Sequence, residues 1–391
     1  MTNSYLESKP RYEILDGLRG VAASIVVAFH LFETYSKGPV FQILNHGYLA
    51  VDFFFLLSGF VIGYAYDDRI GNKMSVWDFF KRRLIRLHPM VIFGGLFGLL
   101  LFYFGESDAF PLINQTSVFK VIIIFLLGCL MIPSKSSWDI RGWSETYPLN
   151  GPCWSLMLEY IANILYALVI RRFSKIVLAV FVALSALLTV DLALNLNLTG
   201  LFNSDYYAKF TVIGGWGIDA QQLYVGFSRL LYPFFCGLLI SRIGRFIKIK
   251  GGFWICSLAI TVLLCVPRIG SGDSAWLNGL YETICILILF PLIVNIGAGG
   301  FISGKRSAAI CDFLGRISFP LYITHYPLVY MQMAWVNRHP DAPLSTHIFV
   351  SIAIYIVAVG VAYAALKIYD EPLRNRLKNF HFFTTKKENK S

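Results

Sequence analysis

ILDGLRGVAASIVVAFHLFETY, residues 14–35, is an apolar segment long enough to cross a membrane, yet it contains Arg19 and His30. About 20 apolar residues, rising ~1.5 Å each in a helix, span the hydrocarbon core of a bilayer. The two side chains are therefore separated by about 16 Å in depth and lie near opposite faces. Ionisable groups inside a membrane are functional candidates by default. Snorkelling of Arg19 and a structural hydrogen bond of His30 are the alternatives.

The composition of the chain is that of a polytopic membrane protein. Its 391 residues are 56% hydrophobic and 15% charged, whereas soluble proteins contain about 25% charged residues. The net charge of +11 could suggest a nucleic-acid partner, but the Lys and Arg residues fall in short loops and the C-terminal tail, as the positive-inside rule expects. The seven cysteines lie in or beside apolar segments without metal-binding spacing, so we expect no metal site.

Ten further apolar segments follow the first, at 48–66, 88–105, 118–132, 153–170, 176–196, 226–241, 253–269, 279–298, 317–336 and 346–367. The later basic clusters fall on the same side as the N-terminus only if 118–132 does not cross. That segment is among the shortest, which favours a re-entrant or interfacial helix. We therefore predict an all-α bundle of about ten transmembrane helices, with a long outward segment from about 106 to 152.

The predicted organisation has three parts. Residues 1–11 form a cytoplasmic N-terminus, residues 12–376 a single membrane domain, and residues 377–391 a basic cytoplasmic tail. Because the first apolar segment is too long for a signal peptide and holds an arginine, we expect it to remain as the first span. The lipid bilayer is thus the predicted environment, with both termini on the cytoplasmic side.

Three titratable side chains fall at a similar predicted depth. Counting ~1.5 Å per residue, His30, Asp52 and Glu159 lie roughly 6–9 Å below the outer ends of their spans. The outer thirds of other spans add three more charged residues, Asp191, Arg229 and Glu282. A histidine beside a carboxylate is a catalytic pair, because the carboxylate fixes the tautomer and stabilises imidazolium. We expect His30 beside Glu159 or Asp52 in a polar cavity near the outer surface, with structural hydrogen bonds as the alternative for both acids.

Two other segments carry candidate site residues. VWDFFKRRLIRLHP, residues 76–89, is a basic amphipathic entry into a span, and it places Arg83 and Arg86 one turn apart. Arginine suits phosphate recognition, although ordinary anchoring at the membrane surface explains the pair equally well. RISFPLYITHYPL, residues 316–328, places His325 near the middle of the bilayer with Tyr322 one turn away. A histidine between aromatic residues is more often structural than catalytic.

Six segments taken together resemble the acyltransferase 3 family of integral membrane O-acyltransferases. They are LDGLRGVAASIVVAFH at 15–30, GYLAVDFFFLLSGF at 47–60, KRRLIRLHP at 81–89, LNGPCWSLMLEYIANILY at 149–166, LGRISFPLYITHYPL at 314–328 and YDEPLRNRL at 369–377. The similarity covers residues from about 12 to 376. It adds Ser58 and Trp154 to Tyr322 and His325 as pocket candidates.

The resemblance implies a ten-span enzyme that takes an acyl group, usually acetyl, from cytoplasmic acyl-CoA to a hydroxyl, usually of a sugar, on the far side. It implies an essential catalytic role for His30 and a role for Arg83 and Arg86 on the donor side. Some members have an additional extracytoplasmic hydrolase-like domain, whereas this sequence ends at Ser391. We therefore expect either a one-component transfer or a separate extracytoplasmic partner that completes it.

The function that we expect is that of a multipass O-acyltransferase, in a bacterial inner membrane, with no permanently bound cofactor and no nucleic-acid partner. Arg19, Arg83 and Arg86 would hold the phosphates or pantetheine arm of acetyl-CoA. His30 would act as general base on a glycan or lipid-linked carbohydrate, or would carry the acyl group transiently. The alternative from another class is a transporter or flippase for a lipid-linked sugar, although no internal repeat is evident.

Overall fold

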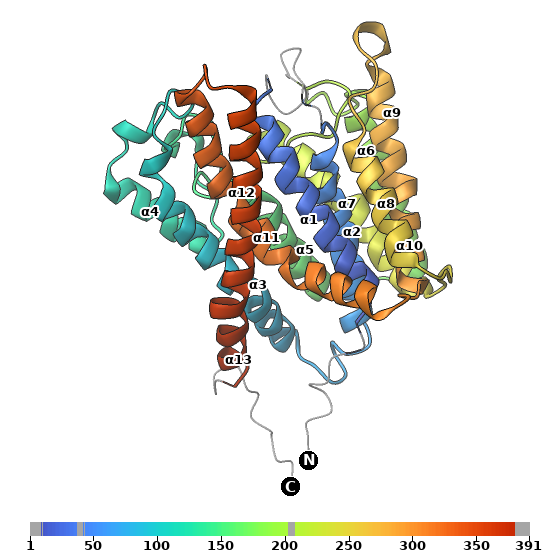
Figure 1. Cartoon of the computed structure of the whole chain (residues 1–391). Coiled ribbons are helices and arrows are strands. Elements are labelled where there is room, and N and C mark those ends of the chain that lie inside the picture. The colour runs from blue at the N-terminus through green and yellow to red at the C-terminus, as the bar shows by residue number, and fades with distance from the viewer. Residues whose placement is uncertain (1–8, 10, 37–41, 43, 202–207, 380–391) are drawn as a thin grey trace.

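The computed structural model describes residues 9, 11–36, 42, 44–201 and 208–379, and these residues form helices and loops without a β-strand (Figure 1). The helices are α1 (Glu13–Glu33), α2 (Ala50–Tyr66), α3 (Val76–Leu101), α4 (Val118–Cys129), α5 (Cys153–Leu168), α6 (Lys175–Ala193), α7 (Ala220–Ile243), α8 (Gly252–Cys265), α9 (Trp276–Ile284), α10 (Phe290–Gly299), α11 (Lys305–Arg338), α12 (Leu344–Ala364) and α13 (Glu371–Asn379). Short π-helical turns join α9 to α10 and α12 to α13. The predicted tail segments 1–8, 10 and 380–391 lie outside the described residues.

Seven helical segments of the described chain are long and apolar enough to cross a membrane, and they include α1, α2, α3, α6, α7, the α9–α10 pair and α12. Each of the ten predicted spans falls on a helical element, although α5 and α8 are shorter. The 12 residues of α4 extend about 18 Å, too short for a hydrocarbon core of about 30 Å. The predicted all-α polytopic bundle is therefore confirmed.

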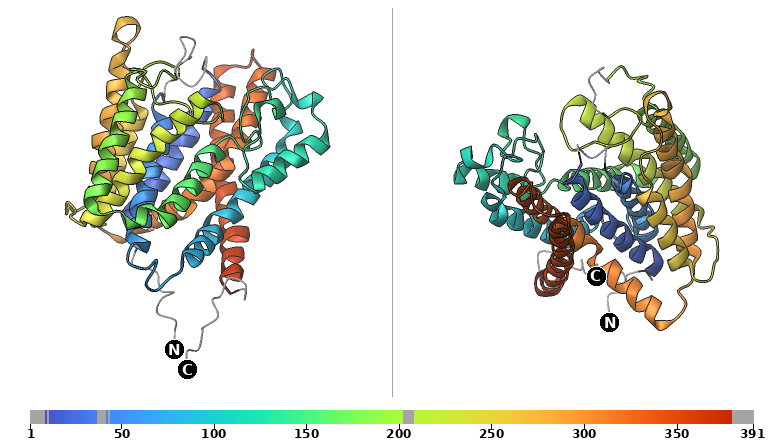
Figure 2. Two further views of the ribbon diagram at one scale, coloured as in Figure 1. Left: turned by 180° about the vertical axis from the view of Figure 1, so that it is seen from behind. Right: turned by 45° about the horizontal axis from the view of Figure 1, so that its top comes forward.

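The first helix lies in the middle of the bundle. In both views of Figure 2, α3, α4 and α12 lie on one side of α1, and α6, α8 and α9 lie on the other. Helix α1 packs along α11, while α2 packs along α7. Small residues allow this close approach, since a Cβ atom added to Gly20 would lie 2.2 Å from the Leu314 carbonyl oxygen. The sequence around Arg19 and His30 is thus held by packing on several sides.

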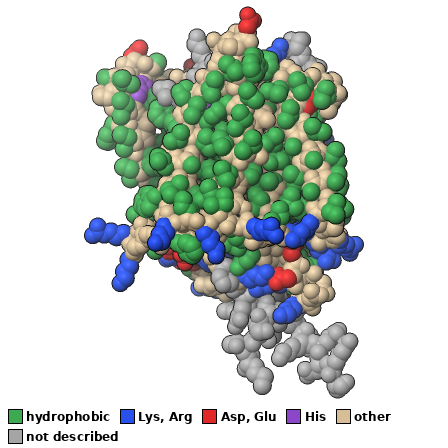
Figure 3. Space-filling view, turned by 90° about the vertical axis from the view of Figure 1, so that its right-hand side faces the viewer, with side chains coloured by type: hydrophobic (Ala, Val, Ile, Leu, Met, Phe, Trp, Pro, Cys, Tyr) green, Lys and Arg blue, Asp and Glu red, His purple; other side chains and the backbone are tan. Residues whose placement is uncertain are grey.

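The two ends of the bundle differ in charge. Figure 3 shows a broad apolar face bordered at one end by a band of Lys and Arg side chains. We call this end, which carries the starts of α1 and α3 and all of α13, the basic end. The opposite end, which carries the last turn of α1 and the first turn of α2, is the distal end (Figure 1).

Candidate active site

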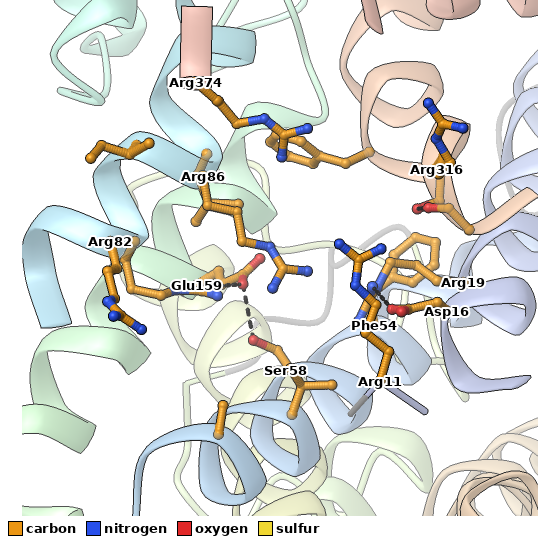
Figure 4. Close-up of a pocket in the computed structure, with 18 of the residues that line it drawn as sticks. Arg11, Asp16, Arg19, Phe54, Ser58, Arg82, Arg86, Glu159, Arg316 and Arg374 are labelled. Carbon is orange, nitrogen blue, oxygen red and sulfur yellow. Dashed lines mark hydrogen bonds and ion pairs between the residues drawn. The ribbon is translucent and has the colours of Figure 1, made fainter. Parts of the chain in front are cut away.

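A cavity of about 1230 Å³ opens at the basic end between α1, α2, α3, α5, α11 and α13 (Figure 4). Eleven Lys and Arg residues line it against seven Asp and Glu residues, so the lining is cationic. The cations are Lys9, Arg11, Arg19, Arg69, Lys81, Arg82, Arg83, Arg86, Arg316, Arg374 and Lys378. Pockets for drug-sized ligands occupy about 300–1,000 Å³. This cavity therefore suits a larger anionic ligand.

Arg83 and Arg86 meet the cavity in different ways. Arg83 is buried, and its Nη2 donates to Glu159 Oε1 at 2.5 Å. Ser58 Oγ donates to the same carboxylate oxygen at 2.9 Å. Arg86 is exposed, and among the described residues it has no hydrogen bond or ion pair. Its guanidinium is therefore available to an anion in the cavity, whereas that of Arg83 is already neutralised.

Arg19 enters the cavity from the opposite wall. Its Nη1 donates to Asp16 at 3.0 Å, one turn earlier on α1. Figure 4 shows Arg19 and Arg86 pointing into the cavity from α1 and α3. Glu159 and Arg86 are close enough to interact electrostatically with Arg19. The three predicted donor-side arginines thus lie around one cavity, in which Arg83 and Arg19 have acidic partners.

The predicted pairing of His30 with Asp52 or Glu159 is wrong. Asp52 is fully buried and accepts hydrogen bonds from Arg229, the shortest at 2.7 Å. Arg229 also donates to the backbone oxygens of Tyr48 and Gly214. Asp52 therefore belongs to a packed polar network and not to a wet outer cavity.

Glu282 and Asp191 are also paired with protein donors at the distal end. Glu282 accepts hydrogen bonds from the Tyr48 hydroxyl and from the backbone N–H of Val212. Asp191 accepts from the hydroxyl of Tyr224. Each of these two carboxylates is satisfied by neighbouring protein donors, so the expected outer polar cavity is filled by packed protein.

Glu159 lies deeper than predicted because α5 begins inside the bundle. Residues 145–156, which lead into and start this helix, are all buried. The side chain of Asn150 donates to the backbone oxygen of Ile323 on α11 at 2.8 Å. Counting from a surface start therefore placed Glu159 in the distal half, whereas it lies in the basic cavity.

His30 has a different carboxylate partner, which the sequence reasoning missed. Its Nδ1 lies 2.7 Å from Oε2 of Glu33, three residues along α1. The i,i+3 spacing places the two side chains on one helix face and could have identified the pair. The ring also stacks on His325, at 5.5 Å between centroids, and meets the edge of Tyr326 at 4.7 Å.

Two residues of α11 lie between the cavity and His30. Tyr322 lines the cavity, and its hydroxyl lies 2.7 Å from that of Ser155. His325, one turn further along, is fully buried and its Nδ1 lies 2.9 Å from the Tyr322 backbone oxygen. The His325 ring is stacked on the His30 ring. Tyr322 on the cavity wall and His325 against the His30 ring are therefore about one helical turn of α11 apart.

The four predicted pocket candidates divide into two pairs. Ser58 and Tyr322 line the cavity, whereas Trp154 and His325 do not. Trp154 lies against the Arg229 guanidinium, 5.3 Å from its ring centroid, and so packs on the buried Asp52 pair. Over the described residues, no three His, Cys, Asp or Glu side chains gather in a way that could hold a metal ion.

The sequence of this chain is similar to those of known acyltransferases. A family model described as an acyltransferase domain matches residues 12–367. The chain is 25% identical over 399 residues to the O-acetyltransferase OatA of Staphylococcus aureus, covering 97% of this chain and 60% of that protein. It is 31% identical over 166 residues to Protein 2 in the picA locus of Rhizobium radiobacter, covering 40% of this chain and 81% of that protein.

The chain thus spans about 60% of the length of the Staphylococcus relative. No solved structure shows significant similarity to it. Because the family model extends over nearly the whole chain, including α1 and α11, this protein belongs to the acyltransferase 3 family of integral membrane acyltransferases.

Proposed function

We propose that this protein is a membrane O-acyltransferase that moves an acyl group from acyl-CoA in the basic cavity to a hydroxyl of a carbohydrate at the distal end. The main support for the proposal is the cationic cavity of about 1230 Å³, whose lining includes Tyr322, one turn of α11 from the His325–His30 pair. The name of the Staphylococcus relative favours acetyl as the acyl group.

The cavity suits coenzyme A in two respects. Arg86, which makes no hydrogen bond or ion pair within the described chain, is a donor for a phosphate, and planar guanidinium groups bind phosphates bidentately. The hydroxyls of Ser58, Ser155 and Tyr322 at the inner end suit the amide groups of the pantetheine arm. Arg19 and Arg83 line the same space beside their partners Asp16 and Glu159, and the excess of Lys and Arg in the lining gives the cavity a positive potential.

The chemistry assigned to His30 is general base catalysis. In this proposal the ring takes the proton of the acceptor hydroxyl, whose oxygen attacks the thioester carbonyl. The new C–O ester bond forms as the C–S bond breaks, and the departing thiolate of coenzyme A receives the proton from the imidazolium. Direct transfer requires the hydroxyl and the thioester to approach within ~3–3.5 Å.

The charge distribution supports an orientation. Cytoplasmic loops of membrane proteins are rich in Lys and Arg, so the basic end faces the cytoplasm, where acyl-CoA is available. His30 then lies toward the outer side, where a glycan or lipid-linked carbohydrate is the acceptor. In a bacterium this membrane is the inner, or plasma, membrane.

The test is turnover by the purified protein in lipid nanodiscs, with radiolabelled acetyl-CoA and the surface glycan of the host as acceptor. The wild-type protein should release free coenzyme A and transfer the label to the glycan as an alkali-labile ester. We expect His30→Ala to lower this rate at least about 100-fold, because positioned proton transfer contributes about 10²–10⁴-fold. His339→Ala, in an exposed residue after α11, is the matched control and should retain the rate.

A transporter or flippase for a lipid-linked sugar is the competing function, and it would leave acetyl-CoA intact. Intact donor in the presence of a translocated lipid-linked sugar would contradict the proposal. Wild-type transfer by the His30→Ala protein would also contradict it.

A further inference from the structure

The His30 ring is held from one side by a carboxylate of its own helix. Glu33 lies three residues after His30 on α1, and its Oε2 is 2.7 Å from the ring Nδ1. The His30 and Glu33 side chains are 19% and 14% exposed, so the contact is largely shielded from solvent. A shielded hydrogen bond to a carboxylate is stronger than the same bond in water.

This contact fixes which nitrogen of His30 is available for chemistry. An ionised carboxylate only accepts hydrogen bonds, so the neutral ring must carry its proton on Nδ1. The lone pair then resides on Nε2, which is the nitrogen that can take a proton from a hydroxyl. The edge of Tyr326 and the face of His325 limit rotation of the ring.

The surroundings of Glu33 differ from those of three other buried or half-buried carboxylates. Those three have an arginine partner each, in the pairs Asp52–Arg229, Glu159–Arg83 and Asp67–Arg242. Within the part of the chain that the structure describes, the Glu33 carboxylate has no Lys or Arg partner, and its side-chain hydrogen bond is to His30. Its negative charge is therefore not neutralised by a Lys or Arg salt bridge and can stabilise a positive charge on the imidazole ring.

We propose that Glu33 is the positioning residue of His30: it holds the Nδ1–H tautomer and stabilises the imidazolium that forms when Nε2 takes the acceptor proton. The inference rests on the proposed function, and it names the residue that makes His30 a competent base. Glu33 takes the role that the sequence analysis gave to Asp52 or Glu159, which are paired with Arg229 and Arg83.

The experiment compares wild-type protein, Glu33→Gln, His30→Ala and the double variant in the nanodisc assay with acetyl-CoA. Gln keeps the shape of Glu33 and an oxygen acceptor but removes the charge, so we expect kcat to fall about 100-fold while KM for acetyl-CoA stays within about twofold. Because Glu33 acts through His30, the double variant should be no slower than His30→Ala. Glu106→Gln, an exposed carboxylate that accepts a hydrogen bond from Asn114, is the control.

A structural role would give a different result. If Glu33 only stabilised the fold, Glu33→Gln would lower the thermal unfolding temperature and would reduce the residual rate of His30→Ala by the same factor as that of the wild type. That result, or a Glu33→Gln rate within twofold of the wild type, overturns the inference while the proposed function stands. Failure of the wild-type protein to consume acetyl-CoA refutes the proposed function itself.

Discussion

Arg83 and Arg86 lie one turn apart on α3 and yet have different electrostatic partners. Arg83 is buried against Glu159, and removal of one member of such a pair leaves an uncompensated charge. Arg86 points into the cavity and makes no hydrogen bond or ion pair in the described chain. The Arg83 side chain therefore stabilises the wall of the site, and Arg86 is the better candidate for a ligand contact.

The pKa of Glu145, in the loop before α5, gives a prediction about stability. Burial raises the pKa of this carboxyl from 4.5 to about 7, although the Tyr330 hydroxyl donates to it and Arg141 lies nearby. Between about pH 4.5 and 7 the folded protein therefore retains a proton that the unfolded chain has lost. The free energy of unfolding should decrease by about 3 kcal/mol as the pH rises through this window, and should level off above it.

This pH dependence can be measured by thermal unfolding in detergent between pH 5 and 8. Glu145→Gln keeps an oxygen acceptor for Tyr330 but cannot ionise, so its unfolding temperature should depend less on pH than that of the wild type. Parallel pH profiles for the two proteins would contradict the raised pKa of Glu145.

At the scale of helices, the contact between α2 and α7 depends on glycine. A Cβ atom added to Gly237 of α7 would lie 2.1 Å from the Leu56 backbone oxygen of α2, and backbone cannot move aside as a side chain can. We expect Gly237→Ala to destabilise the bundle by about 1–3 kcal/mol, as overpacking does in well-packed cores.

Gly360 of α12 provides the matched control, because a Cβ atom there meets nothing within 4 Å. Alanine is the better helix former, so Gly360→Ala should be neutral or stabilise the protein by up to about 1 kcal/mol. Thermal unfolding of both variants in the same detergent tests the contact. Equal unfolding temperatures for the two variants would contradict the close packing of α2 on α7.

For the whole molecule, the charge asymmetry between the two ends predicts how the donor binds. Arg86→Ala should weaken binding of acetyl-CoA about 10-fold or more, since a charge-assisted hydrogen bond is worth about 1.5–3 kcal/mol. Binding of acetyl-pantetheine, which lacks the nucleotide phosphates, should be unaffected by the same change. Calorimetric titration of both ligands in nanodiscs measures the difference.

Arg376→Ala is the control for this experiment, because Arg376 is an exposed arginine of α13 that does not line the cavity. Its affinity for acetyl-CoA should match that of the wild type. If Arg376→Ala and Arg86→Ala weakened acetyl-CoA binding equally, only the overall charge of the basic end would matter for binding. Arg86 would then be interpreted as a membrane-anchoring residue.

Local composition was sufficient to predict the class of the fold and most of its helices. Apolar length depends only on local composition, and the basic clusters follow the loops, so the spans and the short 118–132 segment were predictable. The sequence correctly placed Arg19 and His30 on one helix, toward its two ends, because the helical rise fixes the distance between them.

Which charged groups contact one another depends instead on how helices that are distant in the sequence pack together. Depth counting failed for Glu159 because the start of α5 is buried, and no local pattern records where a loop re-enters the bundle. The partners of Asp52 and Glu159 come from α7 and α3, far away in the sequence, so their pairing depends on helix packing. The His30–Glu33 contact is local and could have been found, whereas the approach of His325 to His30 required the packing of α11 against α1.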